Sequence, residues 1–133
     1  MKHIFFILAT LTIMSFEIQA QTVTKKETKG VVAIPVKQFK KMVDSSKYVI
    51  IDIRTPREYR AGHIKGAINI DFYKKDFYDK MAAYKNKPFL FYCRSGNRTG
   101  QARKKFNRMK FKEGYELAHG INTWKRAGYP LVK

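Results

Sequence analysis

The stretch PFLFYCRSGNRTG, residues 88–100, joins an apolar strand pattern to a polar loop and then to the start of a helix pattern. Residues 88–92 are apolar throughout, as in a strand that is buried on both faces of a parallel sheet. Cys93, the only cysteine of the chain, follows at the carboxyl end of this predicted strand. Ligands of open α/β sheets bind at that edge. The stretch therefore predicts a functional site at Cys93.

The loop after Cys93 has the composition of an anion-binding cradle. The amides at a helix start have no partner within the helix, and the positive end of the helix dipole lies there, so both stabilise a thiolate. Gly96 permits a tight curve, and amides turned inward would form a nest around the sulfur. Arg94 and Arg98 add positive charge that would hold an oxyanion such as thiosulfate. We interpret Cys93 as a nucleophile that needs no general base.

Two other interpretations of Cys93 stay open. A free cysteine is commonly a small buried apolar residue, although the polar residues 94–98 do not suit a core position. A Cys–His pair is the second alternative. The histidines downstream of residue 20 are His63 and His119, and neither is close to Cys93 in sequence.

Strand and helix patterns alternate on both sides of this stretch. Apolar runs predict strands at residues 31–34, 48–53, 67–70, 88–92 and 115–117. Helical spacing predicts helices over residues 36–44, 77–84, 102–109 and from 121 to near 128. Residues 55–58 form a capping box with Pro56 at the first helical position, which predicts a short helix that stops before Gly62. The alternation predicts an α/β fold with a mostly parallel sheet.

The chain has 133 residues, enough for one ordinary domain, and we divide it into three parts. Residues 1–20 carry Lys2, an apolar run over residues 4–14 and Ala20. The run is shorter than the about 20 residues of a spanning helix, so we expect a signal peptide and export to the periplasm. An uncleaved anchor or a buried N-terminal helix is the alternative. Residues 21–30 are expected to be a flexible leader, and residues 31–133 the folded domain.

The chain is strongly basic, with 28 Lys and Arg against 10 Asp and Glu and a net charge of +18. Removal of residues 1–20 takes away one residue of each sign, so 27 and 9 stay and the charge is unchanged. In a cytoplasmic domain this charge would suggest nucleic acid. For an exported domain we expect no nucleic-acid partner and no stable membrane insertion after cleavage. Anionic small molecules, the envelope surface or plain solvation would explain the charge.

Three motifs resemble those of rhodanese-like domains. Residues 52–70, DIRTPREYRAGHIKGAINI, resemble the central motif of that family, and residues 93–99, CRSGNRT, resemble its active-site loop. GINTW at residues 120–124, followed by GYP at 128–130, resembles its C-terminal motif. The motifs occur in the order and spacing of the family, and the resemblance covers about residues 31–131.

The resemblance implies a rhodanese-like open parallel five-stranded sheet with helices on both faces. It also implies that Cys93 accepts a sulfane sulfur as a persulfide and passes it to an acceptor. The persulfide-binding loop maps onto Arg94, Ser95, Gly96, Asn97, Arg98 and Thr99. Supporting roles in the scaffold map onto Asp52, Arg54 and His63, the last hydrogen-bonded to backbone beneath the loop. Glu58 is expected to cap its helix.

We therefore expect a sulfurtransferase without cofactor or metal that moves sulfur from thiosulfate or a similar anionic donor to a thiol or cyanide. Because the sequence has no second cysteine, the acceptor must be external. One alternative is a persulfide or anion carrier that acts on a partner protein. The other is a phosphatase or arsenate reductase, which the loop length disfavours. Four residues separate Cys93 from Arg98, whereas phosphatases and arsenate reductases that resemble rhodaneses have five.

Overall fold

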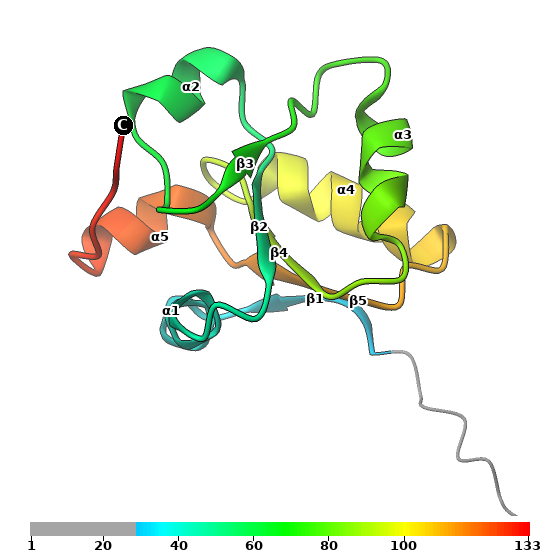
Figure 1. Ribbon diagram of the computed structural model, residues 1–133, viewed down its shortest axis with the longest axis horizontal. Helices are drawn as coiled ribbons and strands as arrows, with labels where there is room; N and C mark the ends of the chain where they lie inside the picture. The colour runs from blue at the N-terminus through cyan, green and yellow to red at the C-terminus, as the bar shows by residue number, and fades with distance from the viewer. Residues whose placement is uncertain (1–28) are drawn as a thin grey trace, which may run out of the picture.

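The computed structural model describes residues 29–133 of the chain (Figure 1). The expected signal peptide and almost all of the expected leader lie outside these residues. Within them, five strands form one all-parallel sheet in the order β1-β5-β4-β2-β3. The strands are β1 (Gly30–Ile34), β2 (Val49–Asp52), β3 (Ile68–Asn69), β4 (Phe89–Tyr92) and β5 (Glu113–Leu117).

Helices cover both faces of the sheet (Figure 1). They are α1 (Val36–Asp44), α2 (Pro56–Ala61), α3 (Phe77–Met81), the 3-10 turn η1 (Ala82–Tyr84), α4 (Asn97–Arg108) and α5 (Gly120–Arg126). Buried side chains of α3 and α4 share one core with one face of the sheet, and those of α1 and α5 share a second core with the other. The predicted α/β fold with a parallel five-stranded sheet is thereby confirmed.

The central strand β4 explains why both cores exist. All four of its residues are buried. Phe89 and Phe91 belong to the core beneath α3 and α4, whereas Leu90 and Tyr92 belong to the core beneath α1 and α5. Side chains of a strand alternate between faces, so an apolar run is what a sheet covered on both sides requires. The next residue, Cys93, turns to the α4 side.

The predicted strand boundaries hold to within two residues, with the largest difference at the start of β5, and the edge strand β3 is half as long as predicted. Residues 67–70 are predicted as a strand, but β3 pairs with β2 only at Ile68 and Asn69. The Asn69 side chain donates from Nδ2 to the carbonyl oxygens of Asp52 and Arg54, at 2.9 and 2.8 Å. The Asn69 side chain thus adds to the backbone hydrogen bonds from Ile70 and Phe72, which continue past the end of β3. Every helix within residues 29–133 is too short or too polar to cross a bilayer.

Candidate active site

Cys93 lies at the carboxyl end of β4, and its side chain is fully buried. The backbone N–H of Gly96 donates a hydrogen bond to its Sγ atom at 3.1 Å. Thr99 Oγ1 lies 3.4 Å from the same sulfur. Cys93 is thus part of the core, as its apolar interpretation expects, yet its sulfur receives an amide N–H, as its interpretation as a nucleophile expects. Within residues 29–133, no hydrogen bond joins the sulfur to a histidine.

Two glycines shape the loop around the sulfur. Gly96 precedes α4 with φ +95°, and a Cβ atom there would lie 3.3 Å from the backbone nitrogen of His119. Gly120 begins α5 with φ +65°, and a Cβ atom there would lie 2.5 Å from the carbonyl oxygen of Arg94. These left-handed conformations and close approaches require glycine. The start of α5 therefore packs directly against the cysteine loop.

Backbone hydrogen bonds fasten the same contact. The N–H of Ile121 donates to the carbonyl of Cys93 at 2.8 Å, and the N–H of Asn122 donates to the carbonyl of Arg94 at 3.2 Å. The predicted C-terminal motif thus supports the loop through its backbone. Each of these carbonyls is held by an N–H from the first turn of α5, so the loop backbone has little freedom to rearrange.

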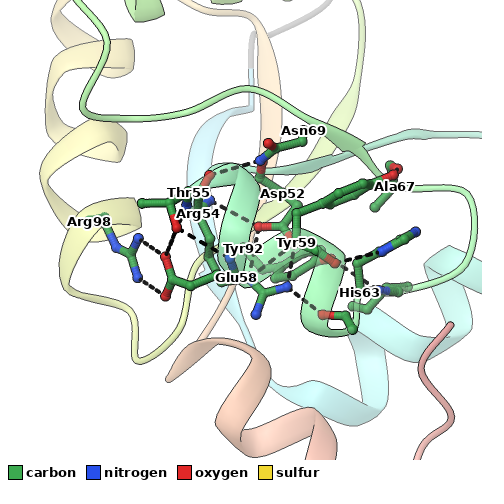
Figure 2. Close-up of polar contacts among 12 residues, drawn as sticks. Asp52, Arg54, Thr55, Glu58, Tyr59, His63, Ala67, Asn69, Tyr92 and Arg98 are labelled. Atoms are coloured by element: carbon green, nitrogen blue, oxygen red, sulfur yellow. Dashed lines mark hydrogen bonds and ion pairs between the residues drawn. The ribbon is translucent and has the colours of Figure 1, made fainter. Parts of the chain in front are cut away.

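Arg98 lies one residue inside α4, and its guanidinium group meets the carboxylate of Glu58 in two hydrogen bonds of 2.8 and 2.9 Å (Figure 2). Glu58 also completes the predicted capping box of α2 with Thr55. The hydrogen bonds from Arg98 lower the pKa of Glu58 to about 2, with help from Thr55 and against the effect of burial. Glu58 in turn raises the pKa of Arg98. Arg98 is therefore a fixed cation beside the loop.

The other predicted loop residues divide by exposure. Arg94, Ser95 and Asn97 are exposed, whereas Thr99 is fully buried. Asn97 Oδ1 accepts a hydrogen bond from Gln101 Nε2 at 3.1 Å. The structure therefore brings Gly96 and Thr99 against the cysteine sulfur, whereas Arg98 pairs with Glu58 and the other three side chains are exposed.

Asp52 and Arg54 form a buried ion pair at the carboxyl end of β2 (Figure 2). Arg54 Nη2 donates to Asp52 Oδ2 at 2.7 Å and to the carbonyl of Gly62 at 2.7 Å. Burial works against the charge of Arg54, but the hydrogen bond and charge of Asp52 outweigh it and raise the pKa of Arg54. The pair ties β2 to the residue that follows α2, and the supporting role that the resemblance implied for it stays a prediction.

His63 is held by the C-terminal end of α2 (Figure 2). Its Nδ1 atom lies 3.0 Å from the carbonyl oxygen of Tyr59, and its ring stacks on the Tyr59 ring with centroids 3.7 Å apart. Its backbone N–H and C=O pair with Val132 at 2.8 and 2.9 Å. The expected hydrogen bond to backbone is present, but its partner is Tyr59 of α2 and not the cysteine loop, and these contacts fasten the C-terminal segment of the chain to α2.

The sequence interpretation missed two residues around the site, Glu116 and Tyr73. Glu116, on β5, is buried and accepts hydrogen bonds from Thr99 Oγ1 at 2.7 Å and from Arg103 Nε at 2.6 Å. Tyr73 is two-thirds exposed, and the Arg98 guanidinium lies 5.5 Å from its ring centroid. The one available indication was the charge of Glu116 within an otherwise buried strand.

This arrangement suits a sulfur anion. The sulfur lies at the start of a twelve-residue helix and receives one amide N–H, and the first turn of that helix carries a fixed arginine. Each of these features favours negative charge on sulfur. The site can therefore support a thiolate and the anion of a sulfur added to it.

The comparisons with known proteins agree with this geometry. The family model described as a rhodanese-like domain matches residues 35–127. The chain is 33% identical over 84 residues to thiosulfate sulfurtransferase GlpE of Coxiella burnetii, covering 63% of this chain and 78% of that protein. It is 33% identical over 86 residues to thiosulfate sulfurtransferase PspE of Escherichia coli, covering 62% and 77%.

A solved structure is similar over nearly its whole length. A rhodanese-related protein from Thermoplasma volcanium superposes with a TM-score of 0.65 at 25% identity, over 75% of this chain and 96% of that one. Other curated relatives are longer: the chain spans 56% of an uncharacterized protein of Synechocystis, to which it is 26% identical. The chain belongs to the family of rhodanese-like domains, which includes thiosulfate sulfurtransferases.

Proposed function

We propose that the protein is a sulfurtransferase that moves a sulfane sulfur from thiosulfate or a similar anionic donor to an external thiol or cyanide. The observation that carries the proposal is the hydrogen bond from the Gly96 N–H to Cys93 Sγ, inside a loop that Arg98 closes after four residues. The relatives GlpE and PspE bear the name thiosulfate sulfurtransferase, which supports the donor class.

The reaction proceeds in two half-reactions at Cys93. The thiolate attacks the outer sulfur of thiosulfate. A bond forms between Cys93 Sγ and that outer sulfur, and the bond between the outer and inner sulfurs of thiosulfate breaks. Sulfite leaves with the electron pair. The added sulfur then carries the negative charge, which the loop amides, the start of α4 and the fixed charge of Arg98 stabilise. A nucleophilic acceptor attacks that outer sulfur and releases the Cys93 thiolate.

The length of the loop from Cys93 to Arg98 favours sulfur over phosphorus as the transferred atom. With four residues between Cys93 and Arg98, the loop turns at Gly96, whose amide already lies 3.1 Å from the sulfur. A cradle of this size suits one added sulfur atom, whereas a tetrahedral oxyanion needs a wider ring. Insertion of one residue between Gly96 and Asn97 is expected to lower thiosulfate activity and to raise oxyanion binding.

A steady-state assay tests the proposal. Purified protein is given thiosulfate and cyanide, and thiocyanate formation is followed beside a control with an aryl phosphate. We expect thiocyanate and no phosphate release. Phosphate release without thiocyanate would replace the proposal with a phosphatase. A protein that takes up sulfur but yields it only to a partner protein would be a carrier.

We further propose that the protein acts after export to the periplasm. The support is the charge and hydropathy pattern of residues 1–20, with Lys2, the apolar run over residues 4–14 and Ala20. Cell fractionation with mass measurement of the mature chain tests this. We expect a chain that begins at Gln21 in the periplasmic fraction, and an intact N-terminus in the cytoplasm would contradict it.

A further inference from the structure

Glu116 is a buried carboxylate on the side of the sheet that holds Cys93. Its neighbours on β5, Tyr115 and Leu117, belong to the core beneath α1 and α5. Because side chains of a strand alternate, Glu116 faces α4 and the cysteine loop. Its residue surface is 4% exposed. A charge in this position requires partners that compensate for the loss of water.

Both carboxylate oxygens of Glu116 are occupied. Arg103 Nε donates to Oε2 at 2.6 Å, and Thr99 Oγ1 donates to Oε1 at 2.7 Å. In the ion pair with Arg103, Glu116 is a carboxylate, which accepts hydrogen bonds and cannot donate them. The hydrogen between Thr99 and Glu116 therefore belongs to Thr99.

Thr99 stands between this carboxylate and the cysteine. Its hydroxyl group lies 3.4 Å from Cys93 Sγ as well as 2.7 Å from Glu116. A hydroxyl has one hydrogen to donate and two lone pairs with which to accept. Since the hydrogen is directed to Glu116, Thr99 can accept from the Cys93 thiol but gives nothing to the Cys93 thiolate.

We propose that Glu116 is a positioning residue for sulfur transfer, which acts through Thr99 to withhold a hydrogen bond from the Cys93 sulfur. The inference rests on the proposed sulfurtransferase function. With Thr99 turned away, the anionic sulfur is held by the Gly96 amide and by the field of the helix start. A sulfur anion that is stabilised less is a stronger nucleophile. Glu116 thereby keeps the resting thiolate reactive toward the sulfur donor.

The other charged or titratable groups near the cysteine loop are not joined to the sulfur through a hydroxyl group as Glu116 is. They are Arg94 in the loop, Arg98 and Arg103 of α4, Glu58 of α2 and His119 before α5. Arg98 is paired with Glu58, and Arg103 is paired with Glu116 itself. Glu116 is joined to the sulfur by a single intervening hydroxyl group.

The variant Glu116→Gln reverses the direction of this chain of hydrogen bonds. The amide must present its Oε1 atom to the Arg103 N–H, because Arg103 can only donate. Its NH₂ group then faces Thr99 and donates to Oγ1. The Thr99 hydrogen is released from its former partner and turns to the sulfur. The variant therefore gives the thiolate an additional hydrogen-bond donor, although it only replaces one carboxylate oxygen with an NH₂ group.

The added hydrogen bond is measured by titrating Cys93 in the resting protein, without any sulfur transfer. Ultraviolet absorbance of the thiolate is followed against pH, and the absorbance of Cys93→Ser is subtracted. We expect the midpoint of Glu116→Gln to lie lower by about one pH unit, the worth of one hydrogen bond to an anion. Glu113→Gln, on the same strand but at its other end, is the matched control and should not shift the midpoint. An unchanged midpoint in Glu116→Gln overturns the proposal.

Thr99→Val distinguishes an effect of Glu116 that passes through the Thr99 hydroxyl group from a direct effect of the Glu116 charge on the sulfur. Because Thr99 donates nothing to the sulfur, we expect Thr99→Val by itself to leave the midpoint near that of the wild type. In the Thr99→Val background, Glu116→Gln should shift the midpoint much less than in the wild type. A rise of about one pH unit in Thr99→Val, or an equal shift in both backgrounds, overturns the proposal.

Single-turnover transfer gives the functional readout. Each protein is mixed with thiosulfate at a pH above both titration midpoints, and formation of the persulfide is followed by mass. We expect several-fold slower sulfur uptake by Glu116→Gln, because its thiolate is a weaker nucleophile, and a wild-type rate from Glu113→Gln. Equal rates in Glu116→Gln and the wild type overturn the proposal. If even the wild type takes up no sulfur, the proposed function fails, while the titration still decides the role of Glu116.

Discussion

The guanidinium group of Arg98 and the carboxylate of Glu58, 40 positions apart in the chain, form two hydrogen bonds of 2.8 and 2.9 Å. This ion pair joins the first turn of α4 to the first turn of α2. Its side chains are 12% and 28% exposed, so water screens the pair only in part. It fixes the closing arginine of the cysteine loop to a helix that follows a different strand.

Glu58→Gln should destabilise the fold and slow sulfur transfer together. Gln preserves an acceptor for the capping box, so the loss reports the Arg98 contact. We expect a decrease of about 2 kcal/mol in the free energy of unfolding at neutral pH, the scale of hydrogen bonds between charged groups. Chemical denaturation measures it. Asp44→Asn, which breaks the exposed pair with Lys40, is the control and should cost less than about 1 kcal/mol.

The contribution of Glu58 to stability should depend on pH in a defined window. Its pKa is lowered from 4.5 to about 2 in the folded protein, chiefly by Arg98. A lowered pKa gives stability that is complete above the unfolded value and disappears as the pH falls through the folded value. The difference in unfolding free energy between wild type and Glu58→Gln should therefore shrink between pH 4.5 and about 2. A constant difference across this window would contradict the assignment.

Gly96→Ala should lower activity more than the small volume of the added methyl group suggests. Residue 96 has φ +95°, and the added methyl group would lie 3.3 Å from the backbone nitrogen of His119. We expect the Gly96 N–H to move away from Cys93 Sγ and thiosulfate activity to fall at least tenfold. Gly100→Ala is the matched control, since it lies within α4 and a Cβ atom there has no neighbour within 4 Å. That control should retain activity and gain about 0.5–1 kcal/mol of stability.

Basic residues away from the loop should act on the rate of encounter with an anionic donor. Salt screens distant charges with a Debye length of about 10 Å at 0.1 M. We expect kcat/KM for thiosulfate to fall as an inert salt is added, while kcat changes little. Lys104→Gln combined with Lys110→Gln, two exposed sites, should flatten this dependence. A kcat/KM that does not depend on salt would show that the net charge of +18 serves another purpose.

The fold was predictable because its main elements carry local patterns. The apolar run of β4 indicates burial on both faces, and residues 55–58 indicate a helix start without any knowledge of the rest of the chain. The position of Cys93 between a strand and a helix likewise follows from neighbours in sequence. Each of these features depends on residues within one or two turns of one another.

The residues that the sequence interpretation missed depend on contacts between distant elements. The capping role of Glu58 accounts for its position completely, so nothing local indicates its second partner, Arg98. Glu116 belongs to a strand whose other polar neighbour, Glu113, is partly exposed and bonds to Tyr115. Only the sheet order, with β5 beside β4, places Glu116 beneath the cysteine loop. Strand order is a property of the whole chain.

The mass of the protein after treatment with thiosulfate tests the central claim most directly. We predict that the wild type gains the mass of one sulfur atom, that fragmentation places it on Cys93, and that cyanide removes it. Cys93→Ser should keep its fold, gain no mass and form no thiocyanate. Sulfur located on any other residue, or thiocyanate formation by Cys93→Ser, would contradict the account.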